Sequence, residues 1–191
     1  MVASSPRNKC EMQSVIGLLL VDNHVLFREG LVSLIASQPD LEVVGQAGST
    51  REAVALALQL RPDIVLMDYT LPDGNGVEST QAILTEWSGA KVVILTAHED
   101  DDVLFAAIRA GAMGLLYKNT RTSELLARLR SVAHGEAGIS PAMARRILDE
   151  FSRALAARQT DPTQSAELTA REIEIVRAIA HVLPIPASPG I

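Results

Sequence analysis

Five short apolar runs alternate with longer stretches of helical spacing, and this rhythm constrains the fold more than any other feature of the chain. The runs occupy residues 15–22, 42–47, 63–68, 91–96 and 113–117. Several are apolar at nearly every position, which is typical of strands buried on both faces. The stretches between and after them predict helices over 24–37, 50–61, 75–87, 100–110 and 121–134. The sequence therefore predicts an α/β fold, with a parallel sheet and helices on both faces.

Local signals support the ends of these helices. Ser49 and Glu52 have the spacing of a capping box before the helix at 50–61. Gly111 and Gly135 stand where helices commonly end in a left-handed glycine.

Composition excludes several classes of protein. Of 191 residues, 48% are hydrophobic and 21% are charged, which argues against a wholly disordered chain. The single cysteine, Cys10, excludes an internal disulfide scaffold and a zinc site built from several cysteines. No apolar run approaches the roughly 20 residues of a membrane helix, and no signal peptide is evident, so we expect a cytoplasmic protein without a membrane partner. The net charge of −6 gives no indication of a nucleic-acid partner.

The regions outside this rhythm are expected to differ in character. Residues 1–14 are polar and unpatterned, which predicts a disordered tail before a domain at 15–135. Residues 136–166 are interpreted as a linker with an amphipathic helix at 143–158, capped by Ser140 and Pro141. Its predicted apolar face contains Met143, Ile147, Leu148, Phe151 and Leu155.

Polar side chains stand at the carboxyl ends of four predicted strands. Asp22 and Asn23 follow the first, Asp68 ends the third, Thr96 ends the fourth, and Lys118 follows the fifth. Ligands of open parallel sheets bind at this edge, so we expect the five side chains to converge there. The oxygens of Asp22, Asn23 and Asp68 suit Mg²⁺, and Asp68 has an oxygen free to attack phosphorus. Thr96 and Lys118 can hydrogen-bond a transferred phosphoryl group.

The chain resembles two-component response regulators of the NarL/LuxR (FixJ) type. Four motifs carry the resemblance, in the family's order along the strands: LLLVDNHVLFREGL (18–31), DIVLMDYTLPDGNGVE (63–78), VVILTAHED (92–100) and AGAMGLLYK (110–118). The resemblance implies a flavodoxin-like (βα)5 doubly wound receiver fold over 15–135. It also implies that Asp68 is the phosphoacceptor, with Lys118 and Thr96 as its catalytic and switch partners. Mg²⁺ would be held by Asp22, Asn23, Asp68 and the backbone carbonyl of Thr70.

The chain departs from the family pattern at two positions. Asn23 replaces the second acid usually found after the first strand, which predicts weaker Mg²⁺ binding than an aspartate would give. Leu115 stands where the family has its switch aromatic, and Tyr117, two residues on, is either a substitute or simply a packed side chain. His24 is interpreted as a helix-start residue in preference to a metal ligand.

Residues 167–180 resemble the first helix of a LuxR-type helix-turn-helix. Three prolines among the last eleven residues leave no room for the recognition helix, so 167–191 is interpreted as a truncated remnant of that domain. Residues 135–191 hold six arginines and seven acidic residues, a net charge of −1. The family implies DNA-binding control of transcription, but the missing basic reading helix argues against direct DNA binding by this chain.

Three functions remain open at this point. The first is a phosphorylatable receiver served by a histidine kinase, acting as a homodimer and without enzyme activity beyond self-phosphotransfer and autodephosphorylation. The second is a phosphorylation-independent, dimerising interaction module. The third is an aspartate-nucleophile phosphatase, which would need a second acid where Thr70 stands.

Overall fold

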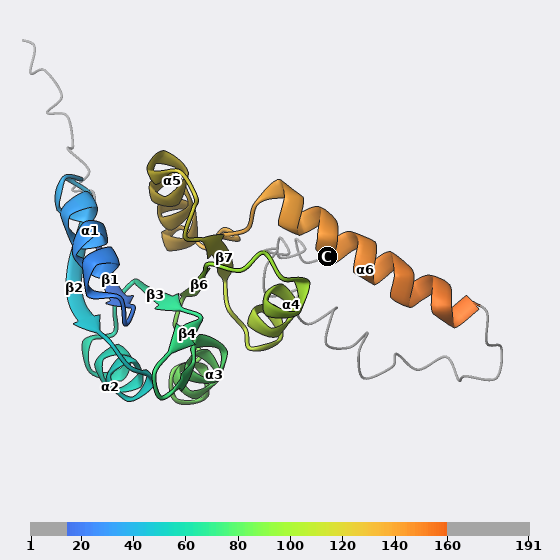
Figure 1. Ribbon diagram of the computed structural model, residues 1–191, viewed down its shortest axis with the longest axis horizontal. Coiled ribbons are helices and arrows are strands. Elements are labelled where there is room, and N and C mark those ends of the chain that lie inside the picture. Colours follow the sequence, from blue (N-terminus) through green and yellow to red (C-terminus); the bar gives the residue numbers. More distant parts are fainter. Residues whose placement is uncertain (1–14, 160–191) are drawn as a thin grey trace, which may run out of the picture.

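The computed structural model of the chain describes residues 15–159 (Figure 1). Five parallel strands form one sheet in the order β2-β1-β3-β6-β7. Their bounds are β1 Ile16–Val21, β2 Leu41–Ala47, β3 Ile64–Asp68, β6 Val92–Thr96 and β7 Gly114–Tyr117. Each overlaps one of the predicted apolar runs, so the parallel α/β fold expected from the sequence is confirmed.

Helices cover both faces of the sheet. One face packs against α1 (Val25–Ala36) and α5 (Thr122–Ala133), and the other against α2 (Thr50–Leu60), α3 (Gly76–Glu86) and α4 (Asp101–Arg109). Figure 1 shows the two groups on opposite sides of the strands. The central strands β3 and β6 are buried at every position, because both their faces are covered.

The helix ends follow the predicted local chemistry. Ser49 Oγ accepts a hydrogen bond from Glu52 N, while Glu52 closes the other half of the cap on Gly48 N, one residue earlier than a capping box requires. Gly111 and Gly135 have φ values of 89° and 88°, so both end their helices in the left-handed region.

A short hairpin was not predicted from the sequence. Strands β4 (Thr70–Leu71) and β5 (Gly74–Asn75) pair antiparallel directly after β3. Gly76 then starts α3 so close to β3 that a Cβ there would meet the Asp68 carbonyl oxygen and, at 2.9 Å, Met67 Cγ. The hairpin thus returns the chain to the end of β3.

The linker helix α6 (Pro141–Gln159) begins where Ser140 caps it, with Met143 N donating to Ser140 Oγ at 3.2 Å. Met143 and Ile147 are buried in the core that includes α4. Leu148, predicted on the same apolar face, is instead 58% exposed. Because it comes directly after the buried Ile147 in the helix, its side chain lies on the side of α6 that is turned away from the receiver. The side chains of Phe151 and Leu155, and the predicted helix-turn-helix remnant, lie outside what the structure describes.

The segment before α6 also pairs with the start of β7, at one edge of the sheet. Gly138 N donates to Met113 O, and Gly138 O accepts from Leu115 N, alongside β7. The close approach requires glycine, since a Cβ on Gly114 would lie 2.6 Å from Gly138 O. No helix within residues 15–159 is long and apolar enough to cross a membrane.

Candidate phosphoryl-acceptor site

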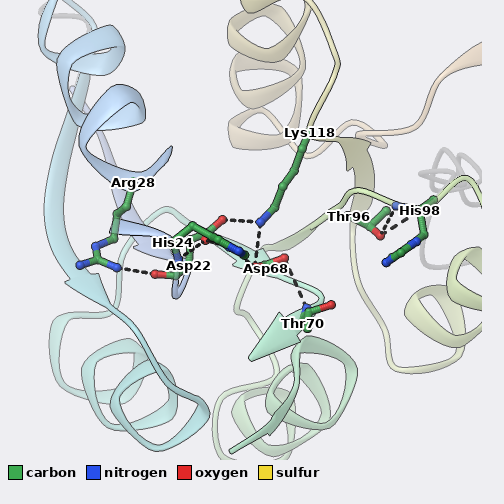
Figure 2. Close-up of polar contacts among 8 residues, drawn as sticks. All are labelled: Asp22, His24, Arg28, Asp68, Thr70, Thr96, His98 and Lys118. Atoms are coloured by element: carbon green, nitrogen blue, oxygen red, sulfur yellow. Dashed lines mark hydrogen bonds and ion pairs between the residues drawn. The ribbon is translucent and has the colours of Figure 1, made fainter. Parts of the chain in front are cut away.

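Three of the predicted residues meet at the carboxyl edge of the sheet. Asp68 is the last residue of β3, and Asp22 follows β1, the strand beside it. Lys118 follows β7 and extends across β6 to reach both acids, as Figure 2 shows. Its Nζ lies 2.7 Å from Asp22 Oδ2 and 2.8 Å from Asp68 Oδ2. The convergence predicted from strand ends therefore occurs for these three side chains.

Both carboxylates are buried, while Lys118 keeps some contact with solvent. The exposed fractions of the side chains are 2% for Asp22, 3% for Asp68 and 16% for Lys118. Burial raises the pKa of Asp68 above its ordinary value, the hydrogen bond from Lys118 opposes that rise, and the nearby Asp22 charge adds to it. Two acids facing one ammonium leave the pocket with one uncompensated negative charge.

Backbone and aromatic contacts fix the orientation of these groups. Thr70 N donates to Asp68 Oδ1 at 3.3 Å, and Arg28 Nη1 donates to the Asp22 carbonyl oxygen. The Lys118 ammonium also lies 4.9 Å from the centre of the Phe27 ring, close enough for a cation–π contact.

Thr96 and Asn23 are placed at this edge without joining the cluster. Thr96 is buried, and its Oγ1 accepts from His98 N at 3.0 Å, pointing away from Asp68 in Figure 2. Asn23 is exposed in the turn between β1 and α1.

Tyr117 packs against the core that contains Leu115. Its hydroxyl accepts from Arg146 Nη1 of α6 at 3.2 Å.

His24 stands at the start of α1, as the sequence predicts, and its side chain also lies beside the acids of the cluster. It does precede α1 as the N-cap, but its side chain makes no capping hydrogen bond. Its Nδ1 instead lies 3.2 Å from Asp22 Oδ1 and 4.0 Å from Asp68 Oδ2. The sequence signal that could have indicated this contact is the position of His24 two residues after Asp22.

The acids present fit a divalent cation. Asp22 Oδ2 is buried and accepts no hydrogen bond of good geometry, although Lys118 is its ion-pair partner at 2.7 Å. Oxygens of Asp22 and Asp68 lie within 4.8 Å of one another, near enough to share one ion. Carboxylate oxygens are the ligands that Mg²⁺ prefers.

Comparison with known proteins agrees with this geometry. Residues 18–130 match the model of one protein family, the response regulator receiver domain. The chain belongs to the response regulator family. The transcriptional regulatory protein LiaR of Bacillus subtilis is 36% identical over 167 residues, which cover 87% of this chain and 77% of LiaR. The uncharacterized transcriptional regulatory protein YxjL of the same organism is 38% identical, over 88% of this chain and 77% of YxjL.

Solved structures give the same family. A LuxR-family two-component response regulator from Aurantimonas sp. SI85-9A1 is 34% identical, with a TM-score of 0.67 over 72% of this chain and 98% of that one. The resemblance and the flavodoxin-like receiver fold expected from the sequence are thereby confirmed. The chain is a two-component response regulator with a receiver domain, and the interaction module independent of phosphorylation is not favoured.

Proposed function

We propose that Asp68 accepts a phosphoryl group from the phosphohistidine of a histidine kinase. The observation that carries this proposal is the Lys118 ammonium, held 2.8 Å from a buried carboxylate at a strand end. An Asp68 oxygen forms the bond to phosphorus, and the bond from phosphorus to the kinase imidazole nitrogen breaks. Lys118 then faces the new phosphoryl oxygens and offsets their charge.

Asp22 and Asp68, with Asn23 and the Thr70 carbonyl, are the proposed holders of Mg²⁺. The ion, when bound, neutralises charge on the phosphoryl oxygens. Asn23 supplies no charge, so we expect Mg²⁺ to bind more tightly to an Asn23→Asp variant.

Thr96 is the proposed switch residue. Its hydroxyl, which donates to the His98 carbonyl oxygen at 3.5 Å, would donate instead to a phosphoryl oxygen on Asp68. Phosphorylation replaces the single negative charge of the Asp68 carboxylate with the roughly −1.5 to −2 of a phosphoryl group, and such an exchange would carry that change to the segment after β6.

Phosphorylation is tested with acetyl phosphate and Mg²⁺, followed by intact-protein mass spectrometry. We expect a phosphoryl adduct that hydroxylamine removes and that Asp68→Asn abolishes. Asp73→Asn is the matched control, because Asp73 is an exposed acid five residues away whose carboxylate accepts from Thr50 N. An adduct retained by Asp68→Asn, or no adduct on the wild type at saturating acetyl phosphate, would refute the proposal.

Control of transcription is the proposed output, supported by relatives named as transcriptional regulators. A homodimer is the proposed assembly and the cytoplasm the proposed location. We expect no sequence-specific DNA binding by this chain, and a salt-sensitive mobility shift on one DNA sequence alone would contradict that expectation.

A further inference from the structure

Arg146 of α6 joins two separate parts of the receiver through one guanidinium nitrogen. Its Nη1 donates to the Tyr117 hydroxyl at 3.2 Å and lies 3.3 Å from Asp101 Oδ1. Tyr117 is the last residue of β7, and Asp101 is the first residue of α4. Figure 1 shows α6 passing beside α4. The linker helix therefore makes polar contact with a strand and a helix of the receiver at once.

The first contact leads back to the phosphoryl-acceptor site along β7. Tyr117 directly precedes Lys118, whose Nζ lies 2.8 Å from Asp68 Oδ2. The Lys118 backbone is tied to the neighbouring strand, since its N–H donates to Thr96 O at 2.8 Å. A movement of Lys118 at the site therefore reaches the tyrosine that contacts α6.

The second contact leads back to the same site through the segment between β6 and α4. Thr96 Oγ1 donates to His98 O at 3.5 Å and accepts from His98 N at 3.0 Å. Two residues further on, Asp100 caps α4 with its side chain, directly before Asp101. A reorientation of the Thr96 hydroxyl therefore releases the segment that positions the start of α4.

The geometry makes both contacts of Arg146 sensitive to small movements. A side-chain hydrogen bond is lost beyond about 3.5 Å, and the two distances are 3.2 and 3.3 Å. The side chains of Arg146 and Asp101 are 39% and 57% exposed, so water replaces a partner that shifts. A displacement well below the length of one residue is enough to break either contact.

We propose that Arg146 couples the docking of α6 to the phosphorylation state of Asp68. In the unmodified protein the guanidinium holds α6 on β7 and α4. When Asp68 carries a phosphoryl group, Lys118 turns to the new oxygens and Thr96 donates to one of them. Both partners of Arg146 then shift, and its two contacts weaken. The inference rests on the proposed phosphorylation of Asp68 and adds the element that responds to it.

The expected release of α6 is partial. Met143 and Ile147 are buried in the core and do not depend on the guanidinium. Polar contacts of this exposure shift an equilibrium by a factor of about two to five. We therefore expect phosphorylation to speed amide exchange across residues 141–153 about threefold.

Amide exchange of these residues, measured with and without acetyl phosphate and Mg²⁺, tests the proposal. The wild type should exchange about threefold faster when phosphorylated, and Asp68→Asn should not respond. Arg146→Met should exchange about threefold faster before any acetyl phosphate is added, and phosphorylation should change it little further. Tyr117→Phe keeps the packed ring, removes the acceptor hydroxyl and should show a smaller response than the wild type.

Arg145→Met is the matched control. It removes the same group at the preceding position, where the side chain is exposed and makes no ion pair or hydrogen bond within the described part of the chain. Both its basal exchange and its response to phosphorylation should equal those of the wild type. Equal behaviour of Arg145→Met and Arg146→Met would overturn the inference.

Mass spectrometry of the same samples separates this inference from the proposed function. An adduct on the wild type without faster exchange of α6, or a full response in Arg146→Met, would overturn the coupling and leave Asp68 as the phosphoacceptor. No adduct on the wild type at saturating acetyl phosphate would overturn both proposals.

Discussion

At the scale of single residues, Lys118 balances two buried acids. Removing its ammonium leaves Asp22 and Asp68 facing each other without their lysine partner, and no other lysine or arginine side chain within residues 15–159 forms an ion pair with either acid. We expect Lys118→Met to lower the free energy of unfolding by about 3 kcal/mol without divalent ions, as for other broken buried pairs. Urea denaturation in the presence of a chelator measures this.

A second variant isolates the charge from the lost packing. Asp68→Asn combined with Lys118→Met removes one acid together with the ammonium, so it should be more stable than Lys118→Met alone. Equal stability of the two variants would show that repulsion between the acids is not the cause.

At the scale of elements, the approach of α3 to β3 depends on Gly76. A methyl group there would press on the Asp68 backbone, so Gly76→Ala should cost about 2 kcal/mol of unfolding free energy. Gly30, exposed within α1, has nothing within 4 Å of an added Cβ. Gly30→Ala should therefore stabilise the protein by about 0.5–1 kcal/mol. Thermal unfolding of the two variants compares their melting temperatures with that of the wild type. Similar shifts in both variants would contradict the role given to Gly76.

A charged pair joins the turn before β2 to α5. Arg130 donates to both Asp40 oxygens, at 2.6 and 2.8 Å, and this lowers the pKa of Asp40 below its ordinary value near 3.8. The native state therefore binds this proton less readily than the unfolded chain. The contribution of the Asp40–Arg130 pair to the free energy of unfolding is present above pH 3.8 and is lost as the pH falls through the lowered native pKa of Asp40.

We expect Asp40→Asn to be less stable than the wild type at neutral pH, with the gap closing well below pH 3.8. The difference in stability between the two proteins is followed by measuring their urea midpoints of unfolding at several pH values across this range. Glu42→Gln, an exposed acid on β2 outside the ion pairs of residues 15–159, is the control and should show no such closing gap. A gap that stays constant with pH would exclude the charge as its source.

The sequence predicted the elements better than their small connections. Fully apolar runs identify buried strands, because only strands covered on both faces lack polar positions. The β4–β5 hairpin was missed because two-residue strands have no hydrophobic period. In the site, the positions of Asp22, Asp68 and Lys118 at strand ends were enough to predict that these side chains lie together. The direction of the Thr96 hydroxyl and the His24 ring was not predictable, because each depends on how the next loop or helix leaves its strand.

At the scale of the whole molecule, α6 is held to the receiver by a few contacts. Met143 and Ile147 are buried against the core, and Arg146 bonds to Tyr117 and pairs with Asp101 at 3.3 Å. We expect Ile147→Ala to speed amide exchange across residues 141–153 by about tenfold or more, because one of the two buried side chains that dock α6 is truncated.

Leu148→Ala is the matched control for this prediction. It truncates an aliphatic side chain of similar size at the next position of the helix, where 58% of the residue is exposed. It should leave the amide exchange rates of residues 141–153 nearly unchanged. Equal effects of the two variants would mean that α6 gains its protection within the helix and not from the receiver.

The Gly138 segment along β7 bears on how the protein behaves at high concentration. Exposed sheet edges are templates for strand addition by other molecules, and the Gly138 segment covers the start of the β7 edge. At the opposite edge, a register shift between the partners of Leu18 and Leu19 leaves Val44 of β2 unpaired, and the exposed Glu42 lies two residues earlier on the same strand. Such bulges and charges discourage pairing. The described domain therefore offers no long, regular edge for aggregation, although its sheet is open.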